Sequence, residues 1–250
     1  MGIENDILVQ MKDVTVSFGK NKKKKTVLSG VELMIRRGEI VGLAGESGSG
    51  KSTIAKAILG MVPVENGTIT LNTKAPQMVF QDPYSSLNPA MTIGWIMQEP
   101  LKLAPKRDPE AKCPDAAARK AKVAEMLHEV GLDESYMAHK PRELSGGQRQ
   151  RICIGTALMT EPELLIADEP VSALDVTIQA QVLALMRELH RKKNLAMLFI
   201  SHDLRTMYHF CDRILILKGG RIIEEGVPDA LYRSPREEYT RLLLKRAGIS

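Results

Sequence analysis

The chain has 250 residues, 44% of them hydrophobic, with 35 basic and 30 acidic side chains. This suits one globular domain with room for a subdomain, and a net charge of +5 does not indicate a nucleic-acid partner. The cysteines Cys113, Cys153 and Cys211 lie far apart without metal-ligand spacing, which predicts free thiols in a reducing compartment. No signal peptide is indicated, and no apolar run approaches the about 20 residues that span a bilayer, so we expect a cytosolic chain.

The first part of the chain is predicted to form strands. Apolar residues spaced by two over residues 9–18 indicate a strand, with a bulge or bend near Lys12 and Asp13, where the spacing slips. A second strand is expected over residues 27–35. The lysine run at residues 20–25 lies between them and is typical of a solvated loop tip; a patch for phosphate or lipid headgroups is the less favoured alternative.

Helix-forming residues dominate the middle of the chain, over residues 83–159. Residues 116–130 carry apolar side chains on one face and are followed by Gly131, which predicts an amphipathic helix that stops there. Residues 104–114 are expected to form a loop, because three prolines interrupt the helical pattern. These prolines are Pro105, Pro109 and Pro114.

Strands and helices alternate in the last third. We expect strands over residues 164–167 and 196–200, separated by a helix whose apolar stripe covers residues 178–189. Residues 213–218 and 221–225 flank two glycines and predict a hairpin. Strands followed by helices imply a mainly parallel sheet, which binds ligands at the carboxyl ends of its strands.

The strongest motif follows a short apolar strand expected over residues 39–44. Residues 45–52 read GESGSGKS and match the P-loop pattern, and a helix should follow over residues 51–59. In a P-loop, backbone N–H groups and the positive helix N-terminus surround phosphates. Lys51 is expected to reach the β- and γ-phosphates of ATP, and the Ser52 hydroxyl to ligate Mg²⁺. The nucleotide-contacting residues predicted here are Gly45, Ser47, Gly48, Ser49, Gly50, Lys51, Ser52 and Thr53.

An apolar strand at residues 164–169 ends in two acids, as in a Walker B motif. Asp168 is expected to hold Mg²⁺ through water, and Glu169 to polarise the attacking water. Two acids after a strand are by themselves more often a solvated turn or a helix cap. Beside a P-loop, the catalytic interpretation is favoured.

A third motif, LSGGQ, occupies residues 144–148. It predicts a second phosphate-binding turn at a helix N-terminus, formed by Ser145, Gly146, Gly147 and Gln148; an ordinary capped helix start is the alternative. One nucleotide rarely needs two such turns from one chain. The two turns make sense when each completes the other's site across a dimer.

With these motifs in order, the chain resembles the nucleotide-binding subunits of ABC transporters over essentially its whole length. The resemblance implies that Gln81 is the Q-loop glutamine, which senses Mg²⁺ and water and faces the transmembrane partner. Residues 172–175 match the D-loop, with Asp175 at its end, and His202 matches the switch histidine that contacts the γ-phosphate. Phe18 matches the aromatic position that stacks on adenine. The implied catalytic residues are thus Glu169, His202 and Gln81, and the implied metal-binding residues are Ser52, Gln81 and Asp168.

The expected fold is α/β: a P-loop NTPase core with a mainly parallel sheet, an N-terminal antiparallel β subdomain and a helical insert. We expect a single domain over residues 1–250. Its α/β core would comprise residues 1–82 and 160–250, and its helical subdomain residues 83–159.

A narrower resemblance begins at the Q-loop, where residues 79–89 read VFQDPYSSLNP and look like the peptide/nickel importer ATPases. This group implies two different ATPase subunits on two transmembrane permease subunits, fed by an extracellular substrate-binding protein. Only 30 positions separate Lys51 from Gln81, so a strand or hairpin is expected to be trimmed there. The end of the chain at Ser250, without a long cysteine-bearing extension, favours the shorter nickel or metallophore type.

We therefore expect a peripheral protein on the cytoplasmic side of the membrane that hydrolyses ATP to power import of peptide, nickel or metal chelate. A non-transport ABC protein acting on nucleic acid or ribosomes is the first alternative, but such chains usually carry two cassettes or a long coiled-coil insert. A P-loop kinase would leave residues 144–148 unexplained. An ATP-binding regulatory module would not need Glu169 and His202.

Overall fold

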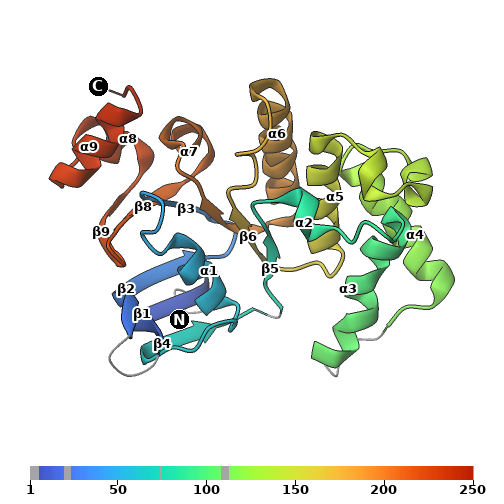
Figure 1. Cartoon of the computed structure of the whole chain (residues 1–250), viewed down its shortest axis with the longest axis horizontal. Coiled ribbons are helices and arrows are strands. Elements are labelled where there is room, and N and C mark those ends of the chain that lie inside the picture. Colours follow the sequence, from blue (N-terminus) through green and yellow to red (C-terminus); the bar gives the residue numbers. More distant parts are fainter. Residues whose placement is uncertain (1–5, 20–23, 74, 108–112, 250) are drawn as a thin grey trace.

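The computed structural model describes residues 6–19, 24–73, 75–107 and 113–249. These residues form two sheets, with helices packed around the larger one (Figure 1). The three-stranded sheet has the order β2-β1-β4, and the six-stranded sheet has the order β5-β6-β7-β3-β8-β9. The strands are β1 (Ile7–Phe18), β2 (Lys25–Arg36), β3 (Ile40–Ala44), β4 (Asn66–Leu71), β5 (Gln77–Val79), β6 (Leu164–Asp168), β7 (Ala196–Ile200), β8 (Arg213–Lys218) and β9 (Arg221–Gly226).

The smaller sheet is antiparallel, as predicted for the N-terminal region. Its central strand β1 carries the expected bulge: the register against β2 shifts between Met11 and Val14, and Asp13 has a φ of 51°. Asp13 also accepts a hydrogen bond from Asn66 Nδ2 of β4 (2.9 Å), so the bulge is tied to the third strand. Residues 20–23 of the lysine run lie outside the described residues, and Lys24 pairs with Glu65.

The larger sheet is parallel from β5 to β8, and only its last pair, β8 and β9, is antiparallel. Strands β3, β6 and β7 are buried along their whole length, as expected for strands covered on both faces. The core accordingly divides into two clusters. Leu165 of β6 packs into the cluster formed with α3 to α7, whereas its neighbour Ile166 packs into the cluster formed with α1 and the smaller sheet.

The helices of the middle region gather at one end of the molecule, opposite the C-terminal pair α8 and α9 (Figure 1). The helices are α1 (Lys51–Ile58), α2 (Pro83–Ser86), α3 (Ile93–Arg107), α4 (Ala116–Glu129), α5 (Gly146–Leu158), α6 (Val176–Lys193), α7 (Leu204–Phe210), α8 (Pro228–Arg233) and α9 (Glu238–Arg246), with the short 3-10 helices η3 (Glu134–Ala138) and η4 (Pro141–Glu143). The predicted mainly parallel sheet, N-terminal antiparallel strands and helical insert are all present. The division of the chain at residues 83 and 159 stays a prediction.

The loop expected over residues 104–114 is wrong in its first part, because α3 continues through Pro105 to Arg107. A proline inside a helix removes one backbone hydrogen bond but keeps a helical φ. The apolar face of α3, which includes the fully buried Ile93 and Met97, packs into the core, and this burial outweighs the lost bonds. Residues 108–112 of that loop lie outside the described residues.

The helix expected over residues 116–130 is present as α4. Asp115 caps it by accepting a hydrogen bond from the Ala118 N–H (2.8 Å), and Gly131, with a φ of 72°, ends it. Among the described residues, no helix has the length and apolar character needed to cross a membrane.

Candidate nucleotide-binding site

The P-loop connects the buried strand β3 to α1 at the carboxyl edge of the parallel sheet. Gly50 is the N-cap of α1, with a φ of 112° and no capping side chain, so the first amides of the helix are left for an external acceptor. A Cβ at Gly50 would lie 2.7 Å from Leu28 Cδ2 and 3.3 Å from Val27 O, so the Leu28 side chain or the loop would have to move. The positive φ and the close approach to β2 together explain why glycine stands there.

Lys51 is buried at 7% exposure and folds back into the loop. Its ammonium donates hydrogen bonds to the carbonyl oxygens of Gly45 (2.8 Å) and Glu46 (3.0 Å). Burial lowers the pKa of Lys51, and the carboxylates of Glu169 and Asp168 oppose that shift. The cation is therefore held at the mouth of the loop, where phosphate oxygens can replace the two carbonyls.

Two acids follow β6, as the sequence predicted. Asp168 is the last residue of the strand; burial raises its pKa, and a hydrogen bond with the Ser52 side chain opposes the shift. Glu169 adopts a φ of 48°, and its N–H donates to Ile200 O at the end of β7 (2.9 Å). The left-handed conformation follows directly on the end of β6, and the bond to Ile200 O fixes the Glu169 backbone beside the end of β7.

The Glu169 carboxylate is contacted on both oxygens. Gln81 Nε2 donates to Oε2 (3.1 Å), and His202 Nδ1 lies 3.2 Å from Oε1. Gln81 follows β5 and His202 follows β7. Because these strands are parallel, both residues lie at the carboxyl edge of the sheet. The cleft that results has a volume of about 330 Å³, and its lining residues are Val27, Ser47, Gly48, Gly50, Lys51, Ser52, Thr53, Gln81, Asp168, Glu169 and His202.

The LSGGQ turn lies elsewhere. Ser145 caps α5 and forms a capping box, in which Gln148 N–H donates to Ser145 Oγ (3.3 Å) and Ser145 N–H donates to Gln148 Oε1 (2.9 Å). Gly147 packs against Ile178 of α6, where a Cβ would lie 2.5 Å from Ile178 Cγ2, and Asp175 caps α6. In the part of the chain that the structure describes, none of the residues Ser145, Gly146, Gly147, Gln148 and Asp175 lines the cleft.

Phe18 is 44% exposed at the end of β1 and, within the described ranges, does not line the cleft either. Sequence reasoning missed Val27 of β2, which lines the cleft, and the contacts that the hairpin β8–β9 makes with the P-loop. Gly220 N–H donates to Ser49 O (3.0 Å), and its carbonyl accepts from Ser29 N–H (3.0 Å), so this glycine ties the P-loop to β2. The Gly219-Gly220 pair signalled only a turn, and the P-loop contact required the fold.

The comparisons with known proteins identify the family of this chain. The sequence profile of the family described as ABC transporter matches residues 28–172. The oligopeptide transport ATP-binding protein OppF of Streptococcus mutans is 42% identical over 95% of this chain and 80% of its own length. OppF of Escherichia coli is 41% identical over 96% of this chain and 75% of its own, and the probable D,D-dipeptide transport ATP-binding protein DdpF of Escherichia coli is 39% identical over 96% and 79%.

A solved structure of an ATP-binding cassette has a similar fold. The dimeric post-hydrolysis structure of the ATP-binding cassette MJ0796 bound to ADP and Pi is 28% identical, with a TM-score of 0.77, covering 88% of this chain and 99% of that one. The resemblance drawn from residues 45–52, 144–148 and 164–169 is thereby confirmed. The chain belongs to the ABC transporter family and is an ATP-binding, ATP-hydrolysing subunit of a transport system.

Proposed function

We propose that this chain powers a peptide importer from the cytoplasmic face of the membrane. The observation that carries the proposal is the convergence of Lys51, Asp168, Glu169, Gln81 and His202 on one cleft. The cargo class comes from the relatives, since the three named above are all described as oligopeptide or dipeptide transport proteins. These names favour peptide over the nickel or metallophore cargo expected from chain length.

In this proposal the P-loop amides and Lys51 bind the ATP phosphates. Ser52, Asp168 and Gln81 would hold Mg²⁺, and their hydroxyl, carboxylate and amide oxygens are the hard donors that this ion prefers. The Ser52 side chain is within hydrogen-bonding reach of Asp168, so two of the donors already meet in one place. When bound, Mg²⁺ neutralises charge that develops on the transferred phosphoryl group.

Glu169 would accept a proton from the attacking water. Its carboxylate is well placed for this role, because Gln81 and His202 contact its two oxygens and fix its plane. His202 would then turn toward the γ-phosphate when nucleotide binds, as its 64% exposed side chain permits. Phe18 would stack on adenine at the outer end of β1.

The second half of each site would come from a second ATPase subunit, which we propose is a different chain. The capping box at Ser145 holds a preformed anion-binding turn outside the chain's own cleft, as a head-to-tail partner would require. The related cassette MJ0796 is described as dimeric. Residues 83–159 would move as a helical subdomain that carries this turn toward the partner's nucleotide.

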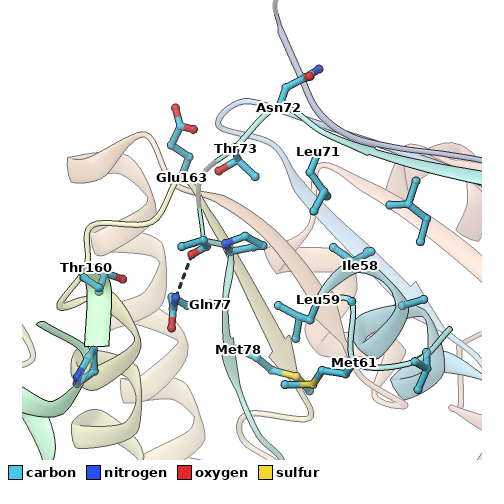
Figure 2. Close-up of a pocket in the computed structure, with 18 of the residues that line it drawn as sticks. Ile58, Leu59, Met61, Leu71, Asn72, Thr73, Gln77, Met78, Thr160 and Glu163 are labelled. Atoms are coloured by element: carbon cyan, nitrogen blue, oxygen red, sulfur yellow. Dashed lines mark hydrogen bonds between the residues drawn. The ribbon is translucent and has the colours of Figure 1, made fainter. Parts of the chain in front are cut away.

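Two transmembrane permease subunits and an extracellular substrate-binding protein complete the proposed transporter. A large open groove of about 1740 Å³, lined by the end of α1, by β4 and β5 and by α3, lies next to the Q-loop. Figure 2 shows Met61 and Met78 on one side of this groove, with Thr160 and Glu163 across β5 from them. Phe80, which precedes Gln81, also lines the groove at 44% exposure, so a permease loop seated there would press on the Q-loop.

The test is ATP-driven uptake of a labelled oligopeptide into proteoliposomes that contain the permeases, both ATPases and the binding protein. We expect uptake with the wild-type chain and none with Lys51→Ala, whereas Lys120→Ala, a change of an exposed lysine on α4, should leave uptake unchanged. ATP-driven uptake of a nickel chelate without peptide uptake would overturn the cargo assignment. Wild-type uptake by the Lys51→Ala transporter would overturn the role of the P-loop.

A further inference from the structure

The C-terminal helix α9 contacts the P-loop, 193 residues away in sequence. Tyr239, in the first turn of α9, is only 8% exposed, and its hydroxyl oxygen accepts a hydrogen bond from the Glu46 N–H (3.3 Å). Near the other end of the helix, Arg246 forms an ion pair with the Glu46 carboxylate. Helix α9 therefore holds residue 46 by both its backbone and its side chain.

The N–H that donates to Tyr239 belongs to the peptide unit between Gly45 and Glu46. The Gly45–Glu46 peptide directs its N–H toward Tyr239, and its carbonyl oxygen accepts from the Lys51 ammonium over 2.8 Å. A trans peptide is planar, with its N–H and C=O on opposite sides, so a partner fixed on one side sets the direction of the other. The orientation of the carbonyl that holds Lys51 is thus coupled to the Tyr239 hydroxyl.

Helix α9 is itself held in place by hydrogen bonds to strand β9. The Glu224 carboxylate of β9 accepts hydrogen bonds from the backbone N–H groups of Arg236 (2.7 Å) and Glu237 (3.2 Å), just before the helix begins. The Lys218 ammonium lies 4.8 Å from the centroid of the Tyr239 ring. These contacts hold the tyrosine ring on the hairpin β8–β9, whose Gly220 also bonds the P-loop.

We propose that Tyr239 is a positioning residue for nucleotide binding: its hydroxyl fixes the Gly45–Glu46 peptide and, through that peptide's carbonyl, the resting place of the Lys51 ammonium. Without the hydroxyl, the Glu46 N–H loses its protein partner at a part-buried position, and the peptide can rotate. The lysine then loses one of its two carbonyl partners, and the loop is less organised to receive phosphate. This inference rests on the proposed role of Lys51.

The test uses the full chain and measures the Kd of a fluorescent ATP analogue. Tyr239→Phe removes only the hydroxyl, and we expect it to raise the Kd by about fivefold to tenfold, the range of one lost hydrogen bond. In the Lys51→Ala background the same change should raise the Kd no further, because the tyrosine acts through the lysine. Tyr208→Phe is the matched control: it removes a hydroxyl that bonds Asp229 of α8, away from the P-loop, and should leave the Kd unchanged.

A second measurement does not depend on nucleotide. Hydrogen–deuterium exchange at the Glu46 amide should be slow in the wild-type chain and faster in Tyr239→Phe, with the exchange of β6 unchanged. An unchanged Kd in Tyr239→Phe, an equal loss in the Lys51→Ala background, an equal loss in Tyr208→Phe, or unchanged exchange at Glu46 would each overturn the inference. Wild-type affinity in Lys51→Ala alone would instead overturn the proposed role of the P-loop lysine.

Discussion

Gln81 and Glu169 are hydrogen-bonded side chain to side chain over 3.1 Å, although 88 residues separate them in sequence. The bond joins the segment after β5 to the segment after β6, two neighbouring strands of the parallel sheet. Since the segment after Gln81 begins the helical region and Gln81 itself is next to the groove beside α3, the bond connects that groove to the carboxylate proposed as the base. A shift of the Q-loop would therefore change the hydrogen bonding and the position of the Glu169 carboxylate directly.

The first prediction concerns this carboxylate. Glu169→Gln should lower ATP turnover of the assembled transporter by about 100-fold or more, because an amide cannot accept the proton of the attacking water. ATP should still bind, and the pair of ATPases should accumulate in a closed, ATP-bound form. Turnover and bound nucleotide are measured on one preparation, with Glu188→Gln, an exposed change on α6, as the control. Normal hydrolysis in Glu169→Gln would assign the base to another residue.

The second prediction separates the two turns that are proposed to bind phosphate, the P-loop and the turn at Ser145. Ser145→Arg places a long cation where a small hydroxyl caps α5, outside the chain's own cleft. We expect nucleotide binding to the isolated chain to survive and turnover of the transporter to fall. Loss of binding in the isolated chain would mean that the turn acts in cis, and unaffected turnover would leave it as a helix cap only. Pull-down with the permeases checks the partner: recovery of this chain as the sole ATPase would make the transporter a homodimer.

The third prediction uses two adjacent glycines of the hairpin β8–β9. Gly220 has a φ of 77°, and a Cβ there would lie 2.1 Å from the backbone oxygen of Val27, so Gly220→Ala must move β2 or the hairpin. We expect it to lower the free energy of unfolding by about 3 kcal/mol. Gly219→Ala has a similar φ of 53°, but its Cβ would meet no atom of the described residues within 4 Å, and the change should cost about 1 kcal/mol. Urea unfolding of both variants provides the comparison, and equal losses would contradict the packing argument.

The fourth prediction concerns the thiols, all three of which are free. Burial raises the pKa of Cys153 to about 12 and also raises the pKa of Cys211, so both remain protonated near neutral pH and are covered. Cys113 is exposed. A thiol reagent at pH 8 should therefore modify Cys113 quickly and the other two only after unfolding. Rapid modification of the Cys113→Ser variant would show that a buried thiol is reached in the native chain.

Much of the fold follows from the sequence because its signals are local. The alternation in β1, the apolar runs of β6 and β7 and the P-loop between a strand and a helix each depend on neighbouring residues, and all three are present. The course of α3 through Pro105 could not be foreseen, since the packing that outweighs the two prolines inside the helix, Pro100 and Pro105, comes from helices elsewhere in the chain. The same holds for Tyr239: its neighbours in sequence do not indicate its contact with the P-loop, and only the folded chain brings its hydroxyl to the Glu46 N–H.

The separation of Ser145 from the cleft that contains Lys51 has a genetic consequence. In a head-to-tail pair, Lys51→Ala and Ser145→Arg in the same chain damage two different composite sites, one through each change. Lys51→Ala in this chain combined with the equivalent serine change in the partner damages a single site twice and leaves the other intact. In the proposed pair of different chains, the distribution of the same two changes between the two genes, and not their number, therefore decides whether the pair retains one working site or none.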